Sequence, residues 1–324
     1  MSEMLPARPF GRSGVTVTEM SLGGAALGNL FRAVSDDDAR AAVDAAWDGG
    51  IRFFDTAPHY GLGLSERRLG AALRDRPREE YVISTKAGRL LVSSSGQGRD
   101  TEGFDVPAAC VRRWDFSADG VRRSLESSLE RLGLDRVDVV FLHDPDEHAG
   151  QALTEAYPAL ERLRGEGVVR AIGAGMNQSR LLERFVRETD IDAVLLAGRY
   201  TLLDQSAAAS LLPAAAERGV SVIAGGVFNS GVLAAPGAGA TYDYAAAPPA
   251  VIGRARELSE ECGRFGVPLR AAAARFPLRH PTVASVLIGA RDAAEMADAL
   301  ALRSLTIPDE LWSALSRADE GSRG

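Results

Sequence analysis

The sequence predicts a closed parallel barrel, the (β/α)8 or TIM-barrel fold, from two observations. Short apolar runs rich in β-branched residues recur along the chain, and amphipathic helical patterns separate them. Eight such alternations are typical of a parallel barrel inside a ring of helices. A chain of 324 residues suits one barrel, so residues 1–324 are interpreted as a single domain. The alternative, an open doubly wound sheet, usually has fewer strands and a phosphate-binding fingerprint after the first of them.

The predicted strands and helices follow one another in order. The strands are expected at residues 20–24, 52–56, 81–86, 138–143, 169–174, 193–197, 220–225 and 284–289. The helices are expected near residues 36–50, 65–73, 117–133, 154–167, 179–190, 206–219 and 292–300. Acidic residues open the first helical segment and glycines close several others, in line with the preferences of helix ends.

Three segments are longer than ordinary loops and show no clear periodicity: 87–117, 226–250 and the tail 303–324. In a barrel the first two leave the C-terminal ends of strands, so we expect them to form lids or substrate loops over the active face. The opening segment, residues 6–24, is expected to begin with a short hairpin that plugs the base of the barrel.

Composition narrows the classes of partner and compartment. The net charge of −7 disfavours a nucleic-acid surface. Cys110 and Cys262 lie far apart and form no C-x-x-C pair, which argues against a disulfide framework or zinc site and fits a reducing cytosol. We expect no signal peptide and no membrane span, because the N-terminus lacks an apolar core and no run approaches eighteen apolar residues. The prediction is a cytoplasmic protein acting on small molecules.

Common nucleotide and metal motifs are incomplete in this chain. GLGLSE (61–66) and GAGMNQ (173–178) resemble the beginning of G-x-G-x-x-G but lack its last glycine. No phosphate-binding loop motif and no H-E-x-x-H occur, and the four histidines have no metal-ligand spacing with the cysteines. The sequence therefore predicts no metal site.

Polar side chains stand at the ends of three successive predicted strands. Asp55 ends the second, with Tyr60 just beyond it; Lys86 ends the third and His143 the fourth. In a barrel such positions indicate catalysis. A nearby ammonium lowers the pKa of a phenol, a carboxylate keeps that ammonium charged, and a histidine can hold a substrate oxygen. This set suits acid–base interconversion of a carbinol and a carbonyl, and it contains no nucleophile for acyl transfer.

With these residues in place, the chain resembles the aldo-keto reductase family from about residue 8 to residue 318. The similarity rests on FFDTAPHYG (53–61), GLSERRLGAAL (63–73), STKAGRLL (84–91) and VVFLHDPD (139–146). The resemblance implies an NAD(P)-dependent oxidoreductase whose catalytic tetrad is Asp55, Tyr60, Lys86 and His143. Tyr60 would be the general acid–base, Lys86 would tune it, and His143 would orient the reacting oxygen. The nicotinamide would carry the hydride.

The resemblance also implies cofactor contacts in four places. Asn177 matches the residue that holds the carboxamide, FNSGVL (228–233) matches a pyrophosphate clasp, and GAR (289–291) matches the loop for the adenosine phosphate. A carboxylate at Glu295 would repel a 2′-phosphate and accept from a ribose hydroxyl, so NAD is expected in preference to NADP. The implied contacts are Asn177, Phe228, Asn229, Ser230, Gly231, Leu233, Gly289, Ala290, Arg291 and Glu295.

Some positions depart from the family pattern. Met176 replaces a usual serine, Ala197 stands near a usual glutamine, and Gly225 falls where an aromatic residue usually stacks on nicotinamide. HDPD, AGRYTLLDQ (197–205) and GGVFNSGVLA (225–234) resemble most the branch that dehydrogenates L-fucose, D-threo-aldoses or L-galactose at C1, with pyridoxal 4-dehydrogenases as close relatives. His59 and Trp114 are candidate substrate contacts.

Three other functions remain open from the sequence. The chain could be a general aldehyde or ketone reductase. It could be a regulatory module that keeps the barrel and cofactor pocket without turnover. It could also be a sugar-phosphate barrel enzyme that uses no nicotinamide. The substrate, the direction of the reaction and the oligomeric state are not predicted.

Overall fold

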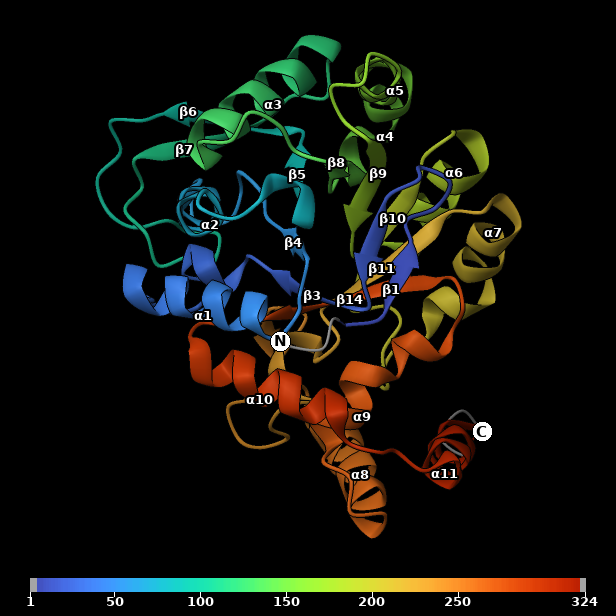
Figure 1. The fold of residues 1–324 in the computed structure, drawn as a ribbon. Helices are drawn as coiled ribbons and strands as arrows, with labels where there is room; N and C mark the ends of the chain where they lie inside the picture. Colours follow the sequence, from blue (N-terminus) through green and yellow to red (C-terminus); the bar gives the residue numbers. More distant parts are fainter. Residues whose placement is uncertain (1–4, 321–324) are drawn as a thin grey trace.

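A computed structural model describes residues 5–320, with side chains up to residue 316. Eight parallel strands close into a barrel that helices surround, which confirms the predicted fold class (Figure 1). Each predicted strand overlaps one observed strand. The barrel strands are β3 (Met20–Gly23), β4 (Phe53–Asp55), β5 (Val82–Ala87), β8 (Val139–His143), β9 (Ala171–Met176), β10 (Ala193–Ala197), β11 (Ser221–Gly225) and β14 (Val283–Gly289).

The strands pair in chain order, and β14 closes the ring against β3. The side chains on both faces of these strands are largely buried, because one face points into the barrel and the other meets the helices. The parallel register puts every strand C-terminus at one end. Asp55, Lys86 and His143 therefore share that end, as the sequence predicted.

The outer helices follow the expected order. They are α1 (Asp36–Asp48), α2 (Leu64–Leu73), α3 (Ala118–Leu132), α4 (Ala149–Gln151), α5 (Tyr157–Gly165), α6 (Ser179–Glu188), α7 (Leu211–Arg218) and α10 (Ala293–Ser304). Ser35 and Ser117 cap α1 and α3, and each accepts the backbone N–H of the third residue of its helix. A π-helical turn, Ala152–Ala156, joins α4 to α5, and the 3-10 turns are Ala26–Gly28, Arg78–Glu80, Asp146–His148, Ser206–Ala209, Asn229–Gly231 and Pro277–Arg279.

The N-terminal hairpin closes the base of the barrel, as expected. It pairs β1 (Ala7–Pro9) with β2 (Thr16–Thr18). Phe10, at its turn, is fully buried among residues that point into the barrel. Its ring lies 6.0 Å from Phe53 and 6.2 Å from Phe141. The hairpin thus supplies the bottom layer of the interior.

The three long segments have more structure than the sequence indicated. Segment 87–117 contains the hairpin β6 (Arg89–Ser93) with β7 (Cys110–Trp114), and segment 226–250 contains β12 (Thr241–Tyr242) with β13 (Ala245–Ala246). The prediction of a loop for the tail was wrong, because α10 continues to Ser304 and α11 spans Asp309–Glu320.

Two further helices were not predicted, α8 (Pro249–Arg264) and α9 (Leu269–Arg275). A signal for α8 was present: proline at its first position and buried Ala255, Leu258 and Cys262 on one side. These helices and α11 share a small separate core, beside the barrel and not inside the βα alternation, so the strand pattern did not require them.

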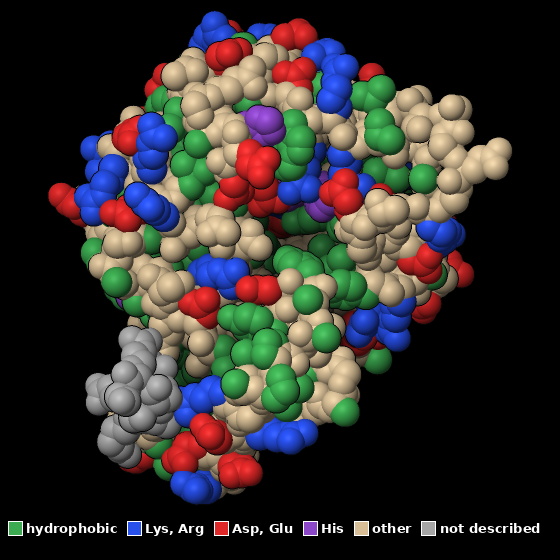
Figure 2. All heavy atoms as spheres, turned by 180° about the vertical axis from the view of Figure 1, so that it is seen from behind, with side chains coloured by type: hydrophobic (Ala, Val, Ile, Leu, Met, Phe, Trp, Pro, Cys, Tyr) green, Lys and Arg blue, Asp and Glu red, His purple; other side chains and the backbone are tan. Residues whose placement is uncertain are grey.

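The face seen in Figure 2 is hollowed near its middle, and hydrophobic side chains border much of this hollow while histidine and charged side chains gather along one edge. No helix of the described chain has both the length and the apolar character needed to cross a membrane.

Candidate active site

The centre of the site is a buried ion pair between Lys86 and Asp55. Lys86 Nζ donates to Asp55 Oδ2 at 2.6 Å and to the carbonyl of Thr56 at 2.9 Å, and both charged side chains are almost fully buried. Ser84 Oγ donates to the other carboxylate oxygen at 2.7 Å. Two buried charges are tolerated only when they are paired and hydrogen-bonded, so this geometry fixes the ammonium in place.

The turn after β4 places Tyr60 beside that ammonium. Lys86 Nζ lies 4.7 Å from the centre of the Tyr60 ring. The turn packs tightly on the loop after β3: a Cβ on Gly28 would lie 2.6 Å from the Tyr60 carbonyl carbon, and one on Gly61 would lie 2.2 Å from the Gly28 oxygen. Only glycine allows this approach, and it holds the phenol at the mouth of the barrel.

The Ser-Glu pair of the GLSERRLGAAL segment anchors α2 behind Tyr60. Ser65 Oγ donates to the carbonyl of Gly24, and the Glu66 carboxylate accepts from Thr85 Oγ1 at 2.9 Å and Arg131 Nε at 2.5 Å. Both residues are fully buried. They fix α2 to β3, β5 and α3, so their role is to position the turn that carries Tyr60.

The electrostatics of Tyr60 differ from the expectation. The sequence suggested that Lys86 would lower the pKa of the phenol, but burial raises the pKa of Tyr60 well above its usual value, and the charges of Asp55 and Asp144 raise it further. The ammonium of Lys86 is paired with Asp55, whose own charge raises the pKa of Tyr60. Arg89 opposes the rise. Without ligands Tyr60 is therefore a protonated group, ready to donate.

Two histidines face Tyr60 and both are neutral. The rings of His59 and His143 lie 5.9 and 5.8 Å from that of Tyr60, and 5.5 Å from each other. Burial, reinforced by Arg89, lowers the pKa of His59 to about 2 and that of His143 well below its usual value. His143 Nδ1 is buried without a hydrogen-bond partner among the described residues. Neutral His143 can donate from one nitrogen to a substrate oxygen.

Arg89 and Asp144 belong to the same cluster, and neither was predicted from the sequence. Arg89 donates through Nη2 to Asp144 and through Nη1 to a ring nitrogen of His59 at 3.2 Å. Its guanidinium stacks on Trp114, 4.3 Å from the ring. The two candidate substrate contacts, His59 and Trp114, are thus brought together by one arginine. The sequence did carry a signal for both residues: Arg89 lies three residues after Lys86, and Asp144 directly follows His143.

A groove runs from Tyr60 across the C-terminal ends of β3, β11 and β14, with a volume of about 660 Å³. Small residues line its middle, so a flat ligand can approach the backbone there. Six predicted cofactor contacts line it: Phe228, Ser230, Gly231, Gly289, Arg291 and Glu295. Asp55 and Tyr60 line the end of the groove at the buried ion pair.

The other four predicted cofactor contacts do not line the groove. Leu233 and Ala290 are fully buried in the cores behind it, so these side chains support the wall from behind. Asn229 is buried and donates to the carbonyl of Gly198 at 3.1 Å, while its Oδ1 has no partner in the described part of the chain. Asn177 lies half-buried just after β9.

Two ion pairs mark the far end of the groove. Arg291 binds Glu295 through its backbone N–H at 2.9 Å and through its guanidinium. Arg270, on α9, pairs with Asp298 at 2.6 Å. Arg270 was not predicted, because it lies on a helix that was itself not predicted.

Two aromatic residues cross the mouth of the groove, and neither was predicted. Phe31 and Tyr244 both line it, and their rings lie 6.3 Å apart. Both have left-handed backbones, φ 65° and 63°, which bulky residues rarely adopt. Arg199 anchors the hairpin that carries Tyr244, because it donates two hydrogen bonds of 2.9 and 3.0 Å to the carboxylate of Asp243.

An elongated nucleotide fits this groove: it has small residues in its middle, arginines at one end and a proton-transfer cluster at the other. Next to the groove residues Phe228 and Ser230, Asn229 Oδ1 is a buried acceptor without a partner among the described residues. Fold and site together define a barrel oxidoreductase whose groove would hold a cofactor next to a tyrosine, a lysine–aspartate pair and a histidine.

The comparisons agree with this class. The Aldo/keto reductase family model matches residues 19–320, and the chain belongs to that family. It is 48% identical to D-threo-aldose 1-dehydrogenase of Pseudomonas sp over 313 residues, 94% of this chain and 95% of that protein. It is 41% identical to pyridoxal 4-dehydrogenase of Microbacterium luteolum, covering 95% and 96% of the two chains. It is 33% identical to L-galactose dehydrogenase of Arabidopsis thaliana, covering 94% and 92%.

A solved structure supports the fold. An aldo-keto reductase from Bacillus halodurans in its holo form superposes with a TM-score of 0.73 at 24% identity, covering 98% of this chain and 96% of that one. The resemblance inferred from the sequence is thereby confirmed at the level of family and fold. The protein is an oxidoreductase of this family, and its cofactor belongs to the nicotinamide class that the family uses.

Proposed function

We propose that the protein oxidises an aldose at C1 to the lactone with NAD. The observation behind this proposal is the polar cluster around Tyr60, in which His143 and a second carboxylate, Asp144, stand side by side at 3.6 Å. Such a pair suits a substrate that carries several neighbouring oxygens. The similarity to D-threo-aldose 1-dehydrogenase, at 48% identity along almost the whole chain, supports the same substrate class.

The four tetrad residues divide the work. The C1 hydroxyl of the cyclic sugar lies between Tyr60 and His143, and His143 holds its oxygen by a hydrogen bond. The proton of that hydroxyl passes to the Tyr60 oxygen as the C1–H bond breaks. A bound nicotinamide would supply the hydride acceptor, and C1 would then become the carbonyl carbon of the lactone. Lys86 keeps a positive charge against the Tyr60 ring, and Asp55 holds Lys86 there.

The direction of proton transfer sets a pH requirement. Burial keeps Tyr60 protonated, so in the unliganded chain it is prepared for reduction. Oxidation needs the phenolate, whose fraction grows as pH rises towards the pKa of Tyr60. Oxidation should therefore speed up with pH over the range in which the protein stays folded.

NAD is proposed in preference to NADP because the arginines at the far end already hold carboxylates. Arg291 is bound by Glu295 and Arg270 by Asp298. A 2′-phosphate would have to displace these partners and would meet their negative charges. A ribose hydroxyl could donate to Glu295 without displacing it.

Pyridoxal oxidation is the second candidate, supported by 41% identity to pyridoxal 4-dehydrogenase. Its chemistry is alike, since a cyclic hemiacetal loses hydride and becomes a lactone. General aldehyde or ketone reduction would use the same site in reverse. A regulatory module without turnover is disfavoured because the tetrad is complete.

The decisive experiment is a spectrophotometric screen for reduced nicotinamide. L-fucose, L-galactose, D-arabinose and pyridoxal are each incubated with NAD⁺ and NADP⁺ and the purified protein. Turnover of an aldose with NAD⁺ is the expected result. If pyridoxal is the best substrate, the proposed substrate is contradicted. If kcat/KM is higher with NADP⁺, the proposed cofactor is contradicted. A separate binding titration that finds no NADH binding would point to a barrel enzyme that uses no nicotinamide.

Two general features complete the proposal. The chain, residues 1–324, is proposed to act as one domain, since the tetrad comes from three adjacent strands of one barrel. A reducing cytosol is the proposed location, and Cys110 and Cys262 are both free thiols.

A further inference from the structure

Asp144 has an unusual position directly after the catalytic His143. Its backbone is left-handed, with φ 44°, and its N–H donates to the carbonyl of Gly175 at the end of the next strand. A residue that is not glycine adopts this conformation at a cost, and such strain concentrates at functional sites. The turn directs the carboxylate back to the histidine, with Asp144 Oδ2 3.6 Å from His143 Nε2.

Arg89 holds this carboxylate in place. The arginine is 11% exposed and bonds Asp144 Oδ2, while the same guanidinium contacts His59 and stacks on Trp114. Its Nε is buried without a partner among residues 5–320. Three fixed contacts leave the arginine little freedom. Asp144 is therefore preorganised by its partner and does not depend on a ligand for its orientation.

One oxygen of Asp144 is left over. Arg89 and His143 both approach Oδ2, and no described residue donates a hydrogen bond to Oδ1. The side chain is 26% exposed, so that oxygen is open to a ligand. Burial raises the pKa of the carboxyl against the opposing effect of Arg89, and the charge of Asp144 raises the pKa of Tyr60 and of Tyr244. Its field therefore reaches the reacting centre.

We propose that Asp144, positioned by Arg89, accepts a hydrogen bond from the hydroxyl on the carbon next to the reacting carbon, and so makes the enzyme selective for 2-hydroxy aldoses. The inference rests on the proposed aldose oxidation and deepens it. His143 holds the oxygen on C1, and the neighbouring oxygen on C2 then falls beside the adjacent carboxylate. An ionised carboxylate accepts from a neutral hydroxyl but repels an anionic oxygen, which favours a sugar over the readily ionised phenol of pyridoxal.

The test compares D-arabinose with 2-deoxy-D-ribose, which is the same pentose without the 2-hydroxyl. Initial rates with NAD⁺ give kcat/KM for both sugars with the wild type, with Asp144→Asn and with Asp144→Glu. Asp146→Asn is the matched control, because Asp146 is an exposed carboxylate two residues further along the same loop.

In the wild type, kcat/KM for D-arabinose should exceed that for 2-deoxy-D-ribose by about tenfold to a hundredfold, the usual value of a hydrogen bond to a charged group. Asp144→Asn and Asp144→Glu should bring this ratio towards one, mainly because KM for D-arabinose rises. Asp146→Asn should keep the wild-type ratio. If Asp144 had only a structural role, its variants would lower kcat/KM for both sugars by the same factor, and the ratio between the sugars would stay at the wild-type value.

Two different failures are distinguishable. A wild-type ratio near one, or a ratio that both Asp144 variants retain, overturns the role of Asp144 while aldose oxidation stands. Absence of NADH or NADPH formation from any aldose with the wild type overturns the proposed function, and the selectivity falls with it. If Asp144→Asn does not fold, Asp144→Glu, which keeps the charge beside Arg89, still decides the question.

Discussion

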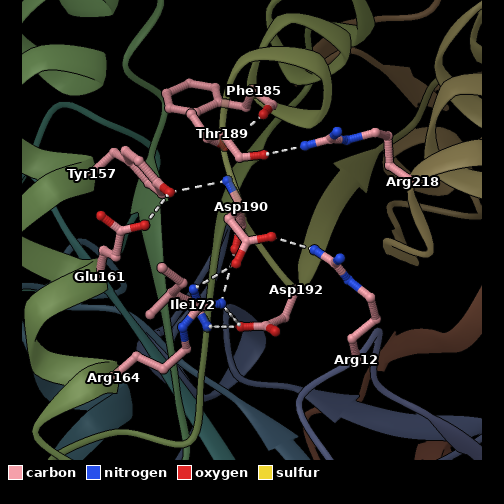
Figure 3. A network of polar contacts seen from close by, with 10 residues as sticks. All are labelled: Arg12, Tyr157, Glu161, Arg164, Ile172, Phe185, Thr189, Asp190, Asp192 and Arg218. Atoms are coloured by element: carbon pink, nitrogen blue, oxygen red, sulfur yellow. Dashed lines mark hydrogen bonds and ion pairs between the residues drawn. The ribbon is translucent and has the colours of Figure 1, made fainter.

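The two ends of the barrel both hold aspartates against basic side chains, but they use them differently. At the N-terminal end, Asp192 precedes β10 and its Oδ2 accepts from the backbone N–H of Ile172 and from Arg164, both at 2.9 Å (Figure 3). Asp138 repeats the arrangement before β8, with Ile83 and Arg78 as donors at 2.9 and 2.7 Å.

At the C-terminal end the polar groups are less completely paired. Six buried side-chain nitrogen or oxygen atoms of the described residues have no partner, and four of them belong to residues near the groove and catalytic cluster: Arg89, Arg112, His143 and Asn229. Left-handed residues that are not glycine also gather there, among them Phe31, Asp144 and Tyr244.

The difference has a physical reason. Buried polar groups are nearly always satisfied, so unpaired atoms and strained backbone in one region indicate a ligand that completes them. The aspartates at the N-terminal end tie one strand to the next, each through a backbone N–H and an arginine. Those at the C-terminal end are held in place but keep free atoms. Stability therefore resides mainly at one end and chemistry at the other.

Among the predicted changes, removing the phenol of Tyr60 at the C-terminal end should have the largest effect on activity and almost none on stability. Tyr60→Phe is expected to lower kcat for aldose oxidation by about 10²- to 10⁴-fold, the usual contribution of general acid–base catalysis, because the substrate proton loses its acceptor. The melting temperature should stay close to wild type, since the ring and its packing remain. Steady-state kinetics and thermal unfolding measure the two. Unchanged turnover on every accepted substrate would show that Tyr60 is not catalytic.

The opposite end should show the reverse pattern. Asp192→Ala is expected to lower the free energy of unfolding by about 3 kcal/mol, because it leaves the backbone N–H of Ile172 and the charge of Arg164 without their buried partner. The matched control is Asp190→Ala, which removes an exposed partner of the same arginine and should cost about 1 kcal/mol or less. Denaturant titration measures both. If both variants lost the same free energy of unfolding, or if the folded Asp192 variant showed a large fall in kcat, the assignment of stability to the N-terminal end and chemistry to the C-terminal end would be contradicted.

The histidines of the catalytic end should make stability depend on pH. The pKa values of His59 and His143 are lowered in the folded chain, so below pH 6.5 the unfolded state binds protons that the folded state does not. The free energy of unfolding should therefore fall as pH drops below about 6.5, by up to about 1.4 kcal/mol per pH unit for each histidine.

Denaturant titrations between pH 5 and 8 measure this slope. His59→Gln should reduce it, and His148→Gln, at a half-buried position outside the cluster around Tyr60, should leave it in place. A stability that is flat from pH 5 to 7 would show that these two rings are accessible to protons in the folded chain.

The smallest predicted effect concerns the far end of the groove. Glu295→Gln is expected to raise kcat/KM with NADP⁺ relative to NAD⁺ by about tenfold, equal to about 1.4 kcal/mol, because it removes a negative charge and leaves Arg291 free for a 2′-phosphate. Asp309→Asn, outside the groove, is the control. A wild type that already prefers NADP⁺ would contradict the role assigned to Glu295.

The sequence by itself predicted the barrel and the polar side chains that gather at its C-terminal end. Alternation of apolar runs with helical patterns is a local signal, and it located all eight strands to within a few residues. Parallel strands bring their C-terminal ends together whatever the loops do. The strand pattern alone therefore placed Asp55, Lys86 and His143 side by side.

Only the tertiary structure decided what surrounds them. The chain path of the long segments, with no periodic pattern to constrain it, brings Arg89 and Tyr244 to the site, where Arg89 orients Asp144, and burial reverses the expected pKa shift of Tyr60. The helices α8, α9 and α11, which were not predicted, pack into their own small core outside the repeat. Such contacts depend on distances in space between residues remote in sequence, and local pattern carries no information about them.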